Sequence, residues 1–128
     1  MTFRLTRTSP VFRQLLLAVL LLLAPLAQAA DQDPQAAWNK IKAGAMLLDV
    51  RTADEFASGH LDLAVNIPHQ QVAAEFAKRG IAKDAPVVLY CKSGRRSAIA
   101  SDSLTAAGYT RIYNGGAYAT LLAQQPKQ

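Results

Sequence analysis

The only cysteine of this 128-residue chain lies in the stretch VVLYCKSGRRSAIAS, residues 87–101. An apolar run precedes Cys91, and the cations Lys92, Arg95 and Arg96 follow within five residues. A turn that contains a glycine and two serines can direct several backbone N–H groups inward, and such a nest before a helix binds anions. The nest and the cations together are expected to lower the pKa of Cys91 and to make its thiolate a nucleophile toward an anionic substrate.

An inert core cysteine is the alternative interpretation, because free cysteines are often buried. The glycine loop, the cations and the position between a strand and a helix favour the reactive thiol. Asp49 and Arg51, in the stretch DVR, end another apolar run, where they could hydrogen-bond each other or brace the cysteine loop. An ordinary surface ion pair is the alternative for these two residues. Glu55 is three residues after Thr52, which predicts a helix-capping role.

The elements that must position these residues can be predicted from hydrophobic patterning. Apolar runs without period-2 alternation, separated by helical segments, indicate an α/β fold whose parallel sheet is covered on both faces. In such sheets, functional groups gather beyond the carboxyl ends of the strands, so Asp49 and Cys91 share one edge if their strands are neighbours. The predicted strands are 45–50, 63–68, 85–90 and 110–114, and the predicted helices are 34–44, 52–59, 70–80, 96–107 and 118–123.

The first 29 residues have the three-part pattern of a secretory signal peptide. Three arginines precede an apolar run over 15–27, and a small-residue cleavage motif ends at Ala29. The alternative is an uncleaved anchor, but the run is short for a span and Pro25 interrupts it. We therefore predict a cleaved signal over 1–29, one domain over 30–128, the general secretion route, a periplasmic location and no stable membrane anchor.

Charge and cysteine content exclude several functional classes. The whole chain carries a formal net charge of +5, but three of its 14 Lys and Arg lie in the predicted signal, which leaves +2 for the remainder. The single basic cluster around Cys91 is too short for a nucleic-acid partner. One cysteine permits neither an internal disulfide nor a CxxC redox pair. One cysteine and two scattered histidines have no metal-site spacing, so no metal is expected.

The chain resembles the single-domain rhodaneses, which are thiosulfate sulfurtransferases, and most closely the small periplasmic rhodaneses of the phage-shock type. The ordered stretches LLDVRTADEFASGHL, AVNIP, VVLYCKSGRRSAIAS and AGYTRIYNGGAY carry this resemblance. It implies a sheet of about five parallel strands with helices on both faces. It also implies that Cys91 is the catalytic residue and carries a persulfide, while the following loop binds the substrate. The loop residues are Lys92, Ser93, Gly94, Arg95, Arg96 and Ser97.

The implied reaction is a two-step displacement in which Cys91 takes a sulfur atom from thiosulfate, releases sulfite and passes the sulfur to cyanide or a thiol. No metal or organic cofactor is expected, and we expect a monomer. The alternative is a periplasmic sulfur carrier or thiol-based binding module with little turnover. A cysteine-dependent phosphatase is disfavoured, because it needs an arginine six residues after the cysteine, where this chain has Ser97.

Overall fold

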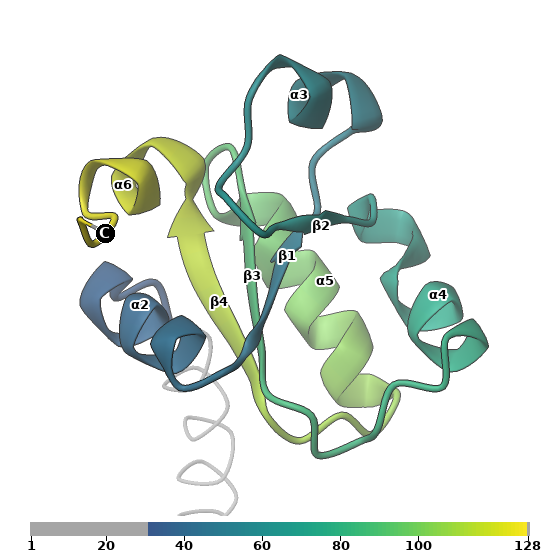
Figure 1. Cartoon of the computed structure of the whole chain (residues 1–128). Coiled ribbons are helices and arrows are strands. Elements are labelled where there is room, and N and C mark those ends of the chain that lie inside the picture. The colour runs from purple at the N-terminus through teal and green to yellow at the C-terminus, as the bar shows by residue number, and fades with distance from the viewer. Residues whose placement is uncertain (1–30, 128) are drawn as a thin grey trace, which may run out of the picture. The chain divides into compact units, whose positions relative to one another are not determined.

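The computed structural model describes residues 31–127, so the predicted signal peptide and its cleavage site lie outside the described residues. Helices and strands alternate along this part of the chain (Figure 1). In chain order they are α2 (Pro34–Lys42), β1 (Met46–Asp49), α3 (Ala53–Ser58), β2 (Val65–Asn66), the 3₁₀ helix η2 (His69–Gln71), α4 (Val72–Lys78), β3 (Val87–Cys91), α5 (Arg95–Ala106), β4 (Ile112–Ala117) and α6 (Tyr118–Ala123).

The strands form one parallel sheet with the order β2-β1-β3-β4. The predicted α/β class with a parallel sheet is therefore confirmed. Each of the four predicted apolar runs contributes a strand, whereas the resemblance implied about five. Within residues 31–127 the sheet has four strands. β2 is only two residues long, because the run 63–68 pairs with β1 only through Val65 and Asn66.

β4 continues through Gly115 and Gly116, where the sequence analysis ended the strand at residue 114. The continuation depends on a close approach to β3. A Cβ atom at Gly115 would lie 3.0 Å from the carbonyl oxygen of Leu89 and 3.0 Å from a methyl group of Val88. Glycine thus lets β4 pair along β3 as far as Ala117, across an irregularity in the ladder near Cys91.

Helices cover both faces of the sheet, as predicted (Figure 1). On one face, Val72 and Phe76 of α4 and Leu104 of α5 pack against strand side chains that include Leu89. On the other face, Trp38 of α2 packs with strand residues and with Leu121 of α6. The Trp38 indole N–H also donates a 3.0 Å hydrogen bond to the Leu121 carbonyl, which fixes α2 against α6.

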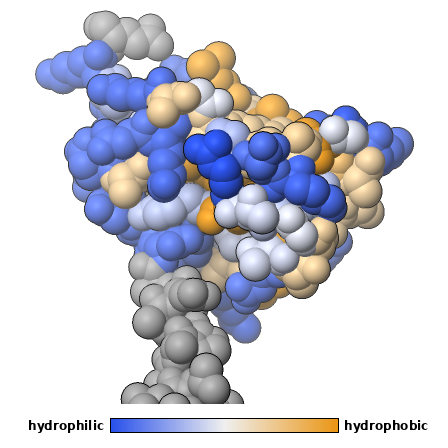
Figure 2. Space-filling view, turned by 90° about the horizontal axis from the view of Figure 1, so that it is seen from below, coloured by the Kyte–Doolittle hydropathy of each residue, from blue (hydrophilic) through white to orange (hydrophobic). Residues whose placement is uncertain are grey.

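The described surface carries scattered apolar side chains. Leu63, Ile99 and Leu122 are its large exposed hydrophobic residues. The face shown in Figure 2 bears hydrophilic residues with apolar ones between them. Isolated apolar residues are usual on protein surfaces. None of the helices between residues 31 and 127 has the length and apolar character needed to cross a bilayer.

Candidate active site

The site lies at the carboxyl edge of the sheet. β1 and β3 are neighbours, and Asp49 is in register with Tyr90, the residue before Cys91. The expectation that Asp49 and Cys91 lie at one edge of the sheet is therefore confirmed. Both residues are fully buried, although each ends its strand. The loop after β3 occupies only three residues before α5 begins at Arg95.

Cys91 is held by the loop that follows it. The backbone N–H of Gly94 donates a 3.0 Å hydrogen bond to the Cys91 sulfur, and the Ser97 hydroxyl lies 3.5 Å from the same atom. Gly94 is the N-cap of α5 and has a left-handed backbone with φ of +91°. The conformation favours glycine, while a Cβ atom there would lie 2.9 Å from the carboxamide oxygen at the flexible end of the Gln32 side chain.

The pKa of the Cys91 thiol reflects two opposing effects. Burial raises it, but hydrogen bonds from Ser97, Ser93 and Gly94 favour the thiolate and outweigh burial, so that the pKa lies below its ordinary value. This direction agrees with the sequence-based expectation. The stabilising groups are neutral N–H and O–H donors, whereas the sequence analysis also assigned this effect to the nearby cations.

The three cations of the loop have different surroundings. Arg96 forms a bidentate ion pair with Glu55 of α3, with N–O distances of 2.7 and 2.9 Å. The Arg96 hydrogen bonds, aided by Thr52 and opposed by burial, lower the pKa of Glu55 to about 2. Lys92 lines a hollow beside the loop. Arg95 is exposed in the first turn of α5 and forms no ion pair with any residue between 31 and 127.

Glu55 has a second contact that the sequence analysis did not predict. Its capping box with Thr52 is confirmed. The same carboxylate also binds Arg96, which is 41 positions away in the chain. No local spacing pattern marks a contact between two such distant residues. Through this ion pair, α3 is fixed to the first turn of α5 next to the cysteine loop.

Asp49 and Arg51 form a buried ion pair, so the surface-pair alternative is wrong for them. The distance between Arg51 Nη2 and Asp49 Oδ2 is 2.6 Å, and their side chains are 7% and 0% exposed. The hydrogen bond to Asp49 raises the pKa of Arg51, against the opposing effect of burial. Arg51 also donates to the carbonyl of Gly59 and lies 4.5 Å from the ring centre of Tyr118. The pair therefore fixes the end of β1 to the turn after α3.

Two hollows of similar size lie at opposite ends of the sheet. The hollow beside the cysteine loop has a volume of about 320 Å³ and is lined by Arg51, Glu55, Ser58, Lys92, Tyr118 and Ala119. It brings Arg51 and Lys92, both predicted site residues, to one cavity.

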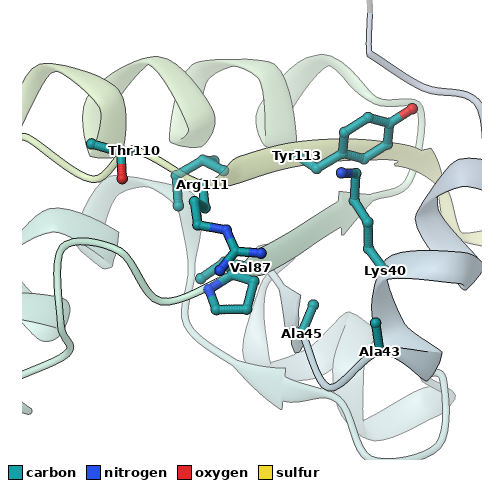
Figure 3. A pocket seen from close by; sticks show the side chains of 9 residues that line it. Lys40, Ala43, Ala45, Val87, Thr110, Arg111 and Tyr113 are labelled. Atoms are coloured by element: carbon teal, nitrogen blue, oxygen red, sulfur yellow. The ribbon is translucent and has the colours of Figure 1, made fainter.

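The second hollow, also about 320 Å³, lies where β3 and β4 begin. Lys40 reaches over the ring of Tyr113, 5.1 Å from its centre, and Arg111 also lines the hollow (Figure 3). None of the predicted site residues is among its lining residues.

Asn114 is a site residue that sequence analysis missed. Its side-chain oxygen accepts hydrogen bonds from the Ser97 hydroxyl at 2.7 Å and from the Gly116 N–H at 3.0 Å. Its side-chain nitrogen donates to the Gly94 carbonyl at 3.2 Å. Asn114 precedes the glycine pair of β4, and the sequence analysis assigned it only to a strand. Its contacts with the loop depend on the pairing of β3 with β4.

The first described residues also reach the site. The carboxylate of Asp31 accepts a 3.1 Å hydrogen bond from the backbone N–H of Asn114. Gln32 has a positive φ of 91° and packs against Gly94 and Gly116. Residues 31 and 32 thus cover part of the cysteine loop. In the described range, no cluster of three or more His, Cys, Asp or Glu side chains is arranged to hold a metal ion.

The fold and the site together define a small α/β domain in which a buried thiol at the end of a parallel strand accepts a hydrogen bond from a backbone N–H of the following loop. The model of the rhodanese-like domain family matches residues 33–121, and the chain belongs to this family.

Relatives of known sequence and structure agree with this assignment. The thiosulfate sulfurtransferase PspE of Escherichia coli is 35% identical over 69 residues, which is 54% of this chain and 66% of PspE. The uncharacterized protein YqhL of Bacillus subtilis is 44% identical over 70 residues, 55% of this chain and 54% of YqhL. The chain thus spans between half and two thirds of these relatives. A solved rhodanese with anions from E. coli superposes with a TM-score of 0.56 and 32% identity, covering 59% of this chain and 89% of that structure.

Proposed function

We propose that the protein is a thiosulfate sulfurtransferase of the rhodanese type and that Cys91 is its nucleophile. The observation that carries the proposal is the buried Cys91 sulfur, which accepts a hydrogen bond from Gly94 N–H at the start of α5. The hydrogen bonds from Ser97, Ser93 and Gly94 lower the pKa of the thiol. The thiolate is the form that attacks sulfur. The name of the relative PspE supports thiosulfate as the donor.

In the first step, the Cys91 thiolate attacks the outer sulfur of thiosulfate. A new sulfur–sulfur bond forms to Cys91 while the sulfur–sulfur bond of thiosulfate breaks, and its electron pair leaves with sulfite. In the second step, cyanide or a thiolate attacks the outer sulfur of the persulfide, and the Cys91 thiolate is regenerated. The covalent persulfide is the only intermediate, so this cycle requires no metal or organic cofactor.

The loop residues would bind the substrate in this mechanism. The Gly94 N–H donates to the sulfur, and the N–H groups of Ser93 and Ser97 also favour the thiolate, so these donors would stabilise the anionic sulfur during transfer. Lys92 and Arg95 have no carboxylate partner among residues 31–127 and would attract the thiosulfate dianion.

Three other residues would act from outside the transfer step. Arg96, paired with Glu55, would hold the loop in place. Asp49 and Arg51 would support the same edge of the sheet. Export to the periplasm and a monomeric state remain predictions from the sequence.

Intact-protein mass spectrometry after incubation with thiosulfate tests the proposal. We expect a mass gain of one sulfur atom that is absent in Cys91→Ser and is discharged by cyanide as thiocyanate. Asp102→Ala, which changes an exposed residue of α5, serves as a matched control and should gain the same mass. A folded protein with a free thiol and no mass gain would reject thiosulfate as the donor.

The same experiment separates an enzyme from a sulfur carrier. A sulfurtransferase releases thiocyanate repeatedly when thiosulfate and cyanide are both in excess. A carrier would gain the sulfur atom once but show no turnover with cyanide or with small thiols. The second result would support the carrier interpretation and reject the enzymatic one.

A further inference from the structure

The hydroxyl group of Ser97 lies within hydrogen-bonding range of three acceptors. Its oxygen is 2.7 Å from Asn114 Oδ1, 3.1 Å from the Gly94 carbonyl and 3.5 Å from the Cys91 sulfur. A serine hydroxyl has a single hydrogen to donate. The three acceptors therefore compete for one proton, and Asn114 Oδ1 is the nearest of them.

The orientation of the Asn114 carboxamide is fixed by its other partners. The side-chain nitrogen donates to the Gly94 carbonyl, and the oxygen accepts from the Gly116 N–H. A flipped carboxamide would place its NH₂ group against the Gly116 N–H and its oxygen against the Gly94 carbonyl, so both bonds would be lost. Asn114 is also only 3% exposed, so water cannot readily replace these partners. The oxygen of Asn114 must therefore face Ser97.

The competition has a different outcome in the two charge states of Cys91. A neutral thiol is a weak acceptor, so the Ser97 hydroxyl donates its hydrogen bond to the nearer Asn114 oxygen. A thiolate is charged and is a stronger acceptor, so the Ser97 hydroxyl turns and donates its hydrogen bond to the sulfur. Asn114 Oδ1 keeps its bond from the Gly116 N–H in both states. The exchange therefore leaves no buried polar atom of Asn114 without a partner.

We propose that Asn114 is a positioning residue that competes with the Cys91 sulfur for the Ser97 hydroxyl proton and thereby limits how readily the thiolate forms. Asn114 touches neither the sulfur nor the substrate in this proposal, because it acts through Ser97. The link to sulfur transfer rests on the function proposed above, whereas the competition for the proton does not. Removal of the competitor should make the thiol more reactive, and removal of Ser97 should make it less reactive.

The charged groups around Cys91 are held by partners other than the side chains of Asn114 and Ser97. Arg96 of α5 interacts electrostatically with Cys91 and is paired with Glu55 of α3. The Asp49–Arg51 pair lies at the end of the neighbouring strand β1.

Two further charged side chains, on other segments, lie near the site of Cys91. The Asp31 carboxylate approaches from the N-terminal side and binds the backbone N–H of Asn114, a bond that does not need the Asn114 side chain. Lys92 is adjacent to Cys91 in the loop.

The test is the pH dependence of alkylation of Cys91 by iodoacetamide in the full chain, which reports the thiolate without any sulfur transfer. Asn114→Ala should increase the alkylation rate below the midpoint about 3- to 10-fold and lower the midpoint pH. Ser97→Ala should decrease the rate and raise the midpoint. In the double variant, the effect of Asn114→Ala should vanish, because it requires the Ser97 hydroxyl.

A control variant, a replacement variant and a folding check accompany the test. Asn39→Ala, at an exposed asparagine of α2, should leave the alkylation profile unchanged. If Asn114→Ala does not fold, Asn114→Asp replaces it, because a carboxylate holds the Ser97 proton more strongly. Asn114→Asp should raise the midpoint, and by less in the Ser97→Ala background. Circular dichroism establishes that each variant is folded.

A purely structural role for Asn114 would give different results. Loosening of the loop in Asn114→Ala would raise the midpoint pH of Cys91 alkylation. A midpoint shift of the same size in the Ser97→Ala background would show that Asn114 does not act through the Ser97 hydroxyl. Either result would overturn the inference. Failure of the wild-type protein to gain sulfur from thiosulfate, together with the expected alkylation profiles, would reject the proposed function and leave this inference standing.

Discussion

Replacement of Glu55 by glutamine should destabilise the protein in a pH-dependent way. Glu55→Gln keeps a side-chain oxygen that can accept the capping hydrogen bond from the Thr52 backbone N–H. It removes the negative charge that pairs with Arg96. The variant therefore isolates the ion pair between α3 and α5, and it replaces no residue of the cysteine loop.

The expected loss is about 1 kcal/mol at neutral pH. A pKa of about 2 for Glu55 in the folded protein, compared with 4.5 for an ordinary glutamate, sets an upper limit of about 3 kcal/mol. The side chains of Arg96 and Glu55 are 27% and 30% exposed, so water screens their attraction. Partly exposed pairs contribute about 1 kcal/mol or less, and the bidentate geometry places this pair at the upper end of that range.

The pH dependence follows from the direction of the shift. The pKa of Glu55 is depressed in the folded state, so its stabilisation is fully present above pH 4.5 and is lost as the pH falls toward 2. Urea unfolding of the wild type and Glu55→Gln between pH 7 and pH 2 measures this. The two free energies of unfolding should differ by about 1 kcal/mol at pH 7 and converge at low pH.

Glu75→Gln serves as a control, since it breaks the 3.3 Å surface pair with Arg79 and should cost less than about 0.5 kcal/mol. A difference between wild type and Glu55→Gln that stays constant with pH would refute the reasoning.

Three further predictions concern the site. Asp49→Asn leaves the guanidinium of Arg51 buried without its counter-ion and should lower the free energy of unfolding by about 3–5 kcal/mol in urea titrations, whereas a loss under about 1 kcal/mol would contradict a buried pair. Gly94→Ala should slow the alkylation of Cys91, because the φ of +91° at this position disfavours any residue that has a Cβ atom, and an unchanged rate would show that this conformation is not needed to hold the sulfur. Arg95→Ala should raise KM for thiosulfate while changing the free energy of unfolding by less than about 0.5 kcal/mol, and an unchanged KM would remove this exposed residue from substrate binding.

The parts of the fold that were predictable from the sequence are those determined by local patterns. The apolar run before Asp49 and the run before Cys91 each form a strand with buried residues, and such unbroken apolar runs separated by helical segments predicted the parallel sheet. The pair Thr52 and Glu55 has the spacing of a capping box and forms one. In each case the contact partners are within a few residues, or the pattern repeats along one element.

The remaining features depend on contacts between distant segments. Glu55 meets Arg96, and Asn114 meets Ser97, only after the strands have paired. The predicted strand ended at residue 114, before Gly115, but the missing side chain of this glycine permits the approach of β4 to β3. Interactions of this kind carry no local sequence pattern, so the polar network behind the thiol was not predicted.

The contact of Gln32 with the cysteine loop has a practical consequence for the preparation of this protein. Gln32 packs against Gly94, whose N–H binds the Cys91 sulfur, and Asp31 binds Asn114. An affinity tag or fusion partner attached directly to Asp31 would therefore be joined to the chain next to the cysteine loop. Alkylation rates of Cys91 measured on such preparations would depend on the tag as well as on the protein. Kinetic comparisons between variants therefore require the same N-terminal residues in every preparation.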